Sequence, residues 1–494
     1  MQSSYKQGTI FSVGFTAISK VFSFALSLMV AYRLGANAQT DIYFFLILII
    51  AISCGWLQSV NVNIVIPEFM YLREKDAGGA FAFVNFFLYA YLAVAVLIIV
   101  FCIFLPQTAL SAMSHFDARD IARNANLAAF AAFYFSTSFI MTFLISLAES
   151  YKLFKIYFFV PLNSILPIIF FLYSRTPQAL FTGYVAAYLL QIILCLFTLR
   201  KYAGWDFKRV KFSFNKKFKQ NFIFHQPGSI AGTVLAYAPL FMLSAAQAGT
   251  LSALNYSRTL CDGLSDVIIL RVSNIAKVKI TSEAAYGNFS DMANSLLRSN
   301  KILLFILTPV CVFTSVFALD IVKLFFMRGS FGAQDAENTA FFLRLIILSI
   351  PFVALSGTLH NFFSALRIIK EIAPRYTAFA LAFIIIFVAA VKHGGPSAYP
   401  FTLLALYLSG AVLDWQTVKK FAGFLPYSGH LLYMLKMFVL CFICACTVKF
   451  LLAGVTDESI FIKILFNGSC FVVLNTLVFF FTGDIKQFIK ALNI

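Results

Sequence analysis

The chain contains 494 residues, of which 61% are hydrophobic and only 12% are charged. A water-soluble protein of this length cannot bury so much apolar surface, so the composition excludes that class and predicts a polytopic membrane protein. The net charge of +18 is compatible with nucleic-acid binding, but in a membrane protein lysine and arginine are expected to gather in the cytoplasmic loops.

Apolar segments of about 20 residues, long enough to cross a bilayer as a helix, recur along the whole chain. The first is too long for the apolar region of a signal peptide and has no small-residue cleavage site, so no cleavable signal is predicted. The sequence therefore predicts an all-α protein with about 14 transmembrane helices. These fourteen segments lie near residues 10–34, 41–66, 81–105, 127–148, 156–174, 179–199, 223–246, 251–277, 301–326, 339–365, 376–393, 399–416, 431–452 and 460–482.

The basic residues favour one side of the membrane when the N-terminus is placed inside. This bias predicts cytoplasmic N- and C-termini in a bacterial inner membrane, and it assigns the positive charge to anionic lipid headgroups rather than to nucleic acid. The most basic loop joins the sixth and seventh segments and holds eight basic residues against the single acid Asp206: Arg200, Lys201, Lys208, Arg209, Lys211, Lys216, Lys217 and Lys219.

This basic loop also predicts the domain organisation. We expect an N-terminal six-helix lobe at 1–200, a basic cytoplasmic linker at 201–222, a second six-helix lobe at 223–420 and a terminal helix pair at 421–494. Two lobes around a binding site at the membrane midplane are a common plan of transporters. Nothing in the sequence indicates an oligomeric state.

Charged residues inside the apolar segments mark the candidate site. Arg258, Asp262 and Asp266 are spaced by four residues and so share one face of the eighth helix, while Lys20 lies near the middle of the first. Such charges are costly in lipid and normally face a protein interior or a wet cavity. Either they neutralise one another between helices, or the cations bind a phosphate group while the carboxylates tune the site or hold a coupling cation.

Uncharged polar residues extend this candidate set. Asn255 lies one turn before Arg258, and Asn61 lies near the inner end of the second segment with Gln58 and Asn63. Residues of this kind either line a substrate path or form hydrogen bonds between helices. His360, with Asn361 beside it, is isolated in the tenth segment and is interpreted as a packing residue.

Two residues at the outer ends of the first two segments suggest a gate. Asp41 follows Thr40 at the start of the second segment, where an acid usually caps its own helix. Arg33 lies nearby at the end of the first segment, so the alternative is an outer gate pair formed by Arg33 and Asp41.

Signals for enzyme chemistry and for bound cofactors are weak. The five histidines are scattered, and the nine cysteines all fall in apolar segments, so neither a metal site nor a disulfide framework is predicted. No phosphate-binding glycine loop is present, so any energy must come from a coupling cation or from the membrane potential, worth roughly 2.3 kcal/mol per charge per 100 mV. A membrane-embedded glycosyltransferase or polymerase would have to use the loop at 106–126, which offers His115 and Asp117.

Three stretches together resemble the MurJ/MviN lipid II flippases. They are SKVFSFALSLMVAYRLGANAQTD at 19–41, AGTLSALNYSRTL at 248–260 and FMRGSFGAQDAENT at 326–339. The resemblance implies the fold of the multidrug/oligosaccharidyl-lipid/polysaccharide exporters, with two six-helix lobes in a V and two further helices. It also implies movement of an undecaprenyl-diphosphate-linked saccharide from the inner to the outer leaflet. In this resemblance Lys20 takes the place of the family's first cavity arginine. Asp41 corresponds to the family's acid after the turn, and Arg258 corresponds to the family's arginine in the eighth helix.

The sequence departs from the family pattern at several cationic positions. Leu26 replaces a second arginine of the first helix, and Cys54 or a neighbour replaces the arginine of the second. Ser257 replaces the acid before Arg258, and the acid expected three residues after it is shifted to Asp262. Lipid II and an exopolysaccharide or O-antigen-type unit are therefore both candidate substrates. The alternative in the transporter class is a cation-coupled exporter of organic cations.

Overall fold

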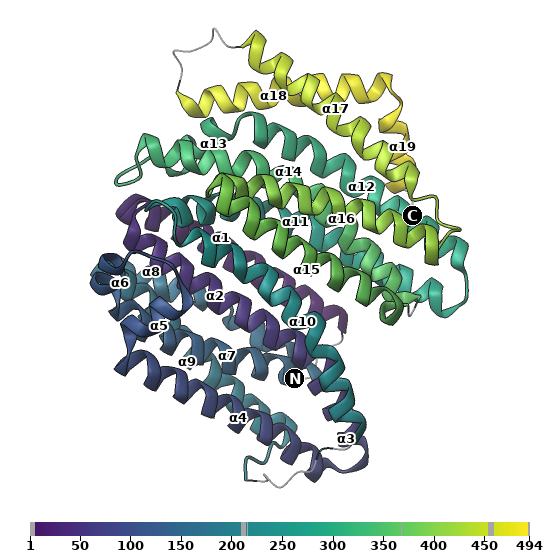
Figure 1. The fold of residues 1–494 in the computed structure, drawn as a ribbon. Helices are drawn as coiled ribbons and strands as arrows, with labels where there is room; N and C mark the ends of the chain where they lie inside the picture. The colour runs from purple at the N-terminus through teal and green to yellow at the C-terminus, as the bar shows by residue number, and fades with distance from the viewer. Residues whose placement is uncertain (1–4, 209–213, 215, 367, 453–458, 493–494) are drawn as a thin grey trace. The chain divides into compact units, whose positions relative to one another are not determined.

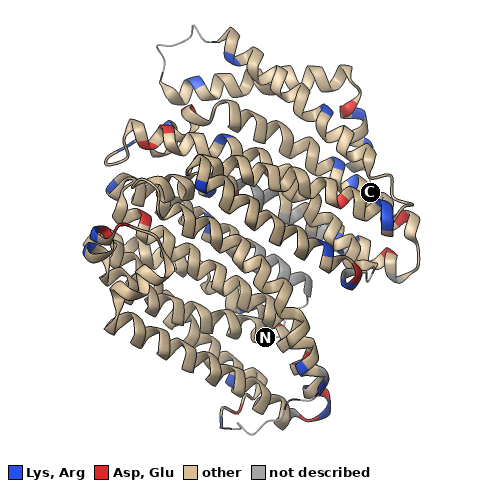
Figure 2. Ribbon diagram, viewed as in Figure 1, with Lys and Arg blue, Asp and Glu red and all other residues tan. Residues whose placement is uncertain are grey.

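The structure is a computed structural model that describes residues 5–208, 214, 216–366, 368–452 and 459–492 (Figure 1). Over these residues the chain forms helices and no strands, which confirms the predicted all-α class. Most charged residues lie near the helix ends, with long uncharged stretches between them (Figure 2).

The helices follow one another with short connections. In chain order they are α1 (Tyr5–Leu34), α2 (Ala38–Val60), the π-helix η1 (Asn61–Val65), α3 (Ile66–Lys75), α4 (Ala77–Phe104), α5 (Pro106–Met113), α6 (Ala118–Asn124), α7 (Asn126–Ser150), the 3-10 helix η2 (Phe154–Phe159), α8 (Leu162–Ser174), α9 (Pro177–Ala203), α10 (Lys216–Leu243), α11 (Thr250–Ala285), α12 (Phe289–Val316), α13 (Ala318–Phe326), α14 (Ala333–Ala365), α15 (Ile369–Gly394), α16 (Ala398–Phe421), α17 (Ser428–Leu451), α18 (Ile460–Phe481) and α19 (Asp484–Leu492).

Within the described residues, 12 helical stretches are long and apolar enough to cross a membrane. They overlap the predicted segments one to six and nine to fourteen, except that the ninth, 301–326, is divided between the span of α12 and the separate helix α13. The predicted seventh and eighth segments coincide with the long helices α10 and α11. The protein is therefore a multi-pass membrane protein, as predicted.

The second span is longer than its apolar segment. A helical stretch runs without interruption through α2, η1 and α3, from Ala38 to Lys75. The π-turn η1 ends two residues before Pro67, which has no backbone N–H and disturbs the regular hydrogen bonding of the preceding turn. In the continuing helix Phe69 is fully buried, and its ring centroid lies 5.7 Å from that of Tyr151.

The chain divides into two compact units. The first contains residues 1–252 and 379–388, and the second contains 253–378 and 389–494. The predicted division into two six-helix lobes, a linker and a terminal pair stays a prediction.

The start of the basic loop is fixed to α4. The indole Nε1 of Trp205 donates to Asn85 Oδ1 at 2.7 Å, and Asn85 Nδ2 donates to the backbone carbonyl of Asp206 at 2.7 Å. Tyr89 donates to the carbonyl of Phe207 at 2.8 Å. Asn85 is fully buried, so these bonds satisfy an amide that would be costly to leave unpaired.

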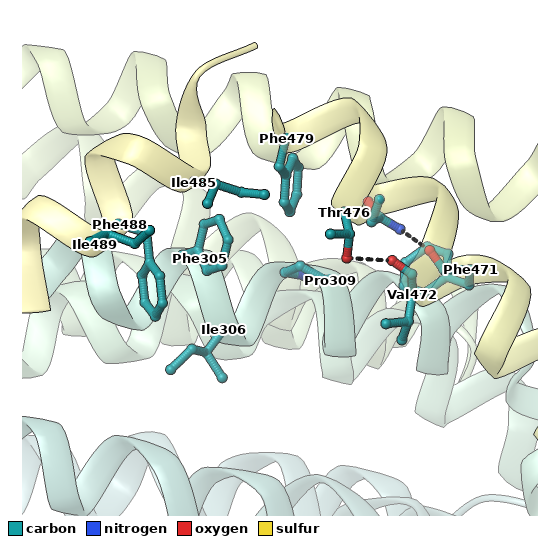
Figure 3. A pocket seen from close by; sticks show the side chains of 11 residues that line it. Phe305, Ile306, Pro309, Phe471, Val472, Thr476, Phe479, Ile485, Phe488 and Ile489 are labelled. Carbon is teal, nitrogen blue, oxygen red and sulfur yellow. Dashed lines mark hydrogen bonds between the residues drawn. The ribbon is translucent and has the colours of Figure 1, made fainter. Parts of the chain in front are cut away.

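The C-terminal helices of the second unit enclose an apolar pocket between α12, α18 and α19 (Figure 3). Phe305 of α12 stacks on Phe488 of α19 with ring centroids 4.2 Å apart. Asp484, at the start of α19, is fully buried and forms an ion pair with Lys436 of α17, whose Nζ lies 2.8 Å from Asp484 Oδ2. These contacts hold the short helix α19 against α12 and α17.

Candidate substrate-binding site

Arg258 lies on α11 in the second unit and is half-buried. Its Nη2 donates a 2.5 Å hydrogen bond to the hydroxyl of Tyr399, which is 1% exposed in the first turn of α16. The Cζ atom of Arg258 lies 5.9 Å from the centroid of the same ring, within the range of a cation–π contact. Tyr399 therefore orients the guanidinium without neutralising its charge.

Two of the predicted companions of Arg258 are described. Asp262, one turn further along α11, is exposed and lies within electrostatic range of Arg258. Asn255 is half-buried, and its backbone carbonyl accepts from Thr259 Oγ1 at 2.9 Å. The side chain of Asp266 lies outside the described residues. The structure thus places Asp262 near Arg258, while the binding roles of Asn255, Asp262 and Asp266 stay predictions.

The loop after α13 holds α11 in place through aromatic packing. Phe331 of the RGSF motif is 2% exposed and meets the fully buried Tyr256 at 5.4 Å, edge to face. Phe326 lies 5.2 Å from the same ring. The turn between them needs a positive φ of 61° at Gly329, a conformation that glycine adopts without strain. Because Tyr256 is two residues before Arg258, this packing fixes the turn that carries the arginine.

Lys20 lies on α1 in the first unit and is exposed. The serines on either side of it join α1 to α8: Ser23 Oγ lies 2.7 Å from Ser164 Oγ, and Ser164 Oγ donates to the carbonyl of Ser19 at 3.3 Å. This part of the serine stripe therefore serves helix packing. Because Lys20 and Arg258 belong to different units, a chamber shared by the two stays a prediction.

Asp41 is 3% exposed and caps a helix distant in sequence. Its Oδ2 accepts from the backbone N–H of Gly249 at 2.7 Å, and its Oδ1 accepts from the backbone N–H and the hydroxyl of Ser252 at 2.7 and 2.5 Å. The expectation that Asp41 caps its own helix is wrong, because Asn37 is the N-cap of α2 and accepts from the N–H of Thr40. The carboxylate instead satisfies the first free N–H groups of α11. The gate pair of Arg33 with Asp41 stays a prediction.

Asn61 lies in η1 and is fully buried inside the first unit. Its Oδ1 accepts from the hydroxyl of Tyr91 at 3.3 Å, and its Nδ2 has no hydrogen-bond partner among the described residues. A π-turn exposes backbone groups that a regular helix would pair, and such turns are frequent at functional sites. The role of Asn61 in a substrate path stays a prediction.

Two polar residues of α16 are not among the site residues predicted from the sequence. Tyr399 resembles any aromatic residue of an apolar segment, so no signal in the sequence connects it to Arg258. Asp414 carried a clear signal, a carboxylate within the predicted segment 399–416, by the same criterion that selected Asp262. It is 1% exposed and accepts from two hydroxyls.

The loop proposed for an enzyme plays a structural part. The ring of His115 packs against Phe241 with centroids 4.2 Å apart, and its backbone N–H donates to Ser244 Oγ at 2.7 Å. Asp117 caps α6 by accepting from the N–H of Arg119 at 2.8 Å. The described residues contain no group of three or more His, Cys, Asp or Glu side chains placed to hold a metal ion.

Helices that can span a membrane, together with an oriented guanidinium on α11, are features of a membrane transporter. The chain belongs to the MurJ family, because the family model "Lipid II flippase MurJ" matches residues 30–470.

Individual relatives support this assignment. A probable lipid II flippase MurJ from Borreliella burgdorferi is 23% identical over 413 residues, which cover 80% of this chain and 79% of that protein. A second, from Rhizobium tropici, is 24% identical over 194 residues, covering 39% and 34% of the two chains.

Solved structures share the fold. A lipid II flippase MurJ in an inward closed conformation matches with a TM-score of 0.74 at 17% identity, covering 95% of this chain and 99% of that chain. An inward-facing multidrug resistance MATE family transporter of the MOP superfamily matches with a TM-score of 0.62 at 13% identity, covering 82% and 96%. The exporter fold expected from the sequence is thus confirmed.

Proposed function

We propose that this protein moves an undecaprenyl-diphosphate-linked saccharide, lipid II or a related exopolysaccharide or O-antigen-type unit, from the inner to the outer leaflet of a bacterial inner membrane by alternating access. Membership of the MurJ family favours this function over an exporter of organic cations and over a glycosyltransferase or polymerase. The orientation that supports outward movement, with both termini in the cytoplasm, follows from the distribution of lysine and arginine.

The observation that carries the proposal is the state of Arg258. A guanidinium within an apolar helix is expensive unless it serves a ligand or an ion pair. Arg258 is oriented by the neutral phenol of Tyr399, and Asp262 lies within electrostatic range of it. An oriented guanidinium offers a planar pair of donors to a diphosphate, to which Lys20 of the first unit would add a point charge. The polyprenyl chain would stay in lipid throughout.

The test is a flipping assay with fluorescent lipid II in proteoliposomes. We expect Arg258→Ala and Lys20→Ala to abolish translocation while the purified proteins keep their wild-type melting temperatures. Arg258→Lys should retain part of the activity, because it keeps the charge and loses the planar donor pair. Lys392→Ala, at an exposed lysine in the last turn of α15, is the matched control and should transport normally.

Full transport by both Arg258→Ala and Lys20→Ala would remove these residues from the site. A wild-type protein that moves neither lipid II nor other undecaprenyl-diphosphate saccharides would refute the proposed function itself.

A further inference from the structure

A group of polar side chains lies inside the first unit, where α10 packs against α2 and η1 (Figure 1). We call it the α2–α10 seam, and it consists of Trp56, Ser59, Asn63, His225 and Gln226. At its centre Ser59 Oγ lies 3.2 Å from His225 Nε2, a hydrogen bond between the two helices. Asn63 Nδ2 donates to the carbonyl of Ser59 at 2.8 Å. Because Asn63 is exposed, the seam is accessible from outside the unit.

Two hydrogen-bond donors of the α2–α10 seam lack an acceptor. Trp56 Nε1 and Gln226 Nε2 are shielded from solvent, and neither has a hydrogen-bond partner within the part of the chain that the structure describes. Trp56 lies one turn before Ser59 on α2, and Gln226 directly follows His225 on α10. Both donors therefore lie within about one turn of the hydrogen bond that joins the helices.

Stability of the fold does not account for these two donors. A buried N–H without an acceptor costs free energy, because it has lost its hydrogen bond to water and gained none. Phenylalanine in place of Trp56 and methionine in place of Gln226 would keep apolar packing without that cost. The packing of α10 is itself apolar, since Phe218 and Phe222 belong to the same core as Val60. The two donors are better explained by an acceptor that comes from outside the chain.

The chemistry of the seam favours a saccharide as the source of this acceptor. An indole N–H only donates, and an amide NH₂ group donates twice. The sequence has no lysine or arginine between positions 56 and 63 or between 222 and 226. Neutral donors suit the hydroxyl and amide oxygens of a glycan, whereas a diphosphate binds best to cationic donors. Sites for small molecules combine aromatic walls with a few placed polar groups, as Trp56, His225 and Gln226 do.

In the predicted orientation the seam begins at the cytoplasmic side of the membrane. The second segment ends inside at residue 66 and the seventh begins inside at residue 223, so Asn63, His225 and Gln226 lie within about 5 Å of these inner ends. Trp56 lies about 15 Å from the inner end of its segment. A lipid-linked saccharide in the inner leaflet carries its glycan at the cytoplasmic surface. The seam therefore lies at the depth where such a glycan would first meet the protein.

The backbone of both helices is interrupted at the seam. Pro227 directly follows Gln226 and has no backbone N–H, so the carbonyl of Ile223 loses its usual partner within α10. On the facing side the π-turn η1 begins at Asn61, and π-turns are frequent at functional sites. Because neither helix has regular hydrogen bonding here, the two can separate locally and admit a ligand between them.

We propose that the α2–α10 seam binds the saccharide of the lipid-linked substrate, with Trp56 Nε1 and Gln226 Nε2 donating hydrogen bonds to its oxygen atoms. These two residues determine specificity for the glycan, whereas the proposed function assigns the diphosphate to Arg258 and Lys20. The inference rests on that function, because the glycan is part of the same substrate. It follows that variants of the seam lose the preference for a lipid with a saccharide over the same lipid without one.

The first test measures the dissociation constants of the purified protein for lipid II and for undecaprenyl diphosphate, and compares their ratio within each variant. We expect the wild-type protein to bind lipid II more tightly. Trp56→Phe and Gln226→Met should each reduce this preference by about fivefold, the value of one hydrogen bond, and leave the constant for undecaprenyl diphosphate unchanged. Trp415→Phe, at an exposed tryptophan of α16, is the matched control and should keep the wild-type ratio.

Melting temperatures of the same variants separate recognition from packing. Because both substitutions remove an unpaired buried donor, we expect midpoints no lower than that of the wild type. Lower midpoints in both variants would show that the donors stabilise the fold and would overturn the inference. Gln226→Met, the smaller change, decides the outcome if Trp56→Phe does not fold.

The binding ratios also distinguish the seam from the proposed function. An unchanged ratio in the variants would mean that the two donors hold a water molecule, and an equal loss for both probes would mean that they shape the protein without recognising the glycan. Either result, or a wild-type protein that binds both probes equally, would overturn the saccharide site and leave the proposed function standing. Failure of the wild-type protein to move any undecaprenyl-diphosphate saccharide is a separate result, which refutes the function itself.

Discussion

Removing the Asp41 carboxylate should destabilise the protein more than any single hydrogen bond would suggest. Asp41→Ala deletes three hydrogen bonds to the start of α11 and leaves the backbone N–H groups of Gly249 and Ser252 buried without their acceptor. Each unpaired buried N–H costs about 1–3 kcal/mol, so we expect a loss of about 4 kcal/mol.

Two milder substitutions provide the scale for this effect. Asp41→Asn keeps one acceptor oxygen but turns an NH₂ group toward a backbone donor, so we expect a loss of about 2 kcal/mol. Ser252→Ala removes only the hydroxyl bond and should cost about 1 kcal/mol. Thermal unfolding of the purified protein in detergent, followed by intrinsic fluorescence, should rank the midpoints as wild type, Ser252→Ala, Asp41→Asn and Asp41→Ala, in falling order.

Hydrogen–deuterium exchange gives a local measurement that the melting temperature does not. The amides of Gly249 and Ser252 should exchange much faster in Asp41→Ala, while those in the middle of α7 should be unchanged. If Asp41→Ala has the same melting temperature as Ser252→Ala and the two amides stay protected from exchange, the carboxylate does not hold the start of α11 and the reasoning is refuted.

Two further predictions concern close packing and the terminal helices. Gly249→Ala should reduce the melting temperature about as much as Asp41→Asn, because Gly249 has a φ of 92° and an added Cβ would lie 2.9 Å from the carbonyl oxygen of Ala36; an unchanged midpoint would show that the turn adapts. Lys436→Met should cost about 3 kcal/mol, since it leaves Asp484 buried without a cation, and Asp484→Asn should cost less because it removes the charge itself. Thermal unfolding of both variants tests this order, and equal midpoints would contradict it.

The helices could be predicted from the sequence because a membrane span must satisfy its backbone hydrogen bonds within itself, which makes length and apolarity sufficient evidence. Hydropathy ends the second segment at residue 66 because the turns that follow are polar, whereas the helix continues to Lys75 with Phe69 fully buried in the protein.

The contacts of the candidate site could not be predicted in the same way. Arg258 and Asp41 stood out as charges in or beside apolar segments. Their partners lie far along the chain: Tyr399 is 141 positions from Arg258, and Ser252 is 211 positions from Asp41. Such pairings depend on which helices become neighbours, and hydropathy carries no information about this. His360 is predicted to be a packing residue because it is isolated in its segment, and its ring does pack against Tyr376, although the identity of that partner on another helix could not be predicted.

The 38-residue stretch from Ala38 to Lys75 has a consequence for the water-facing side of the protein. At about 1.5 Å per residue it measures roughly 57 Å, whereas a bilayer with its headgroups is about 40–45 Å thick. Even a moderately tilted rod of this length extends past the lipid at one end. The overhanging turns belong to α3, where Glu74 and Lys75 are exposed and Arg73 lies over the ring of Tyr151 at 4.8 Å, so the end of this helix offers charges of both signs to the aqueous side.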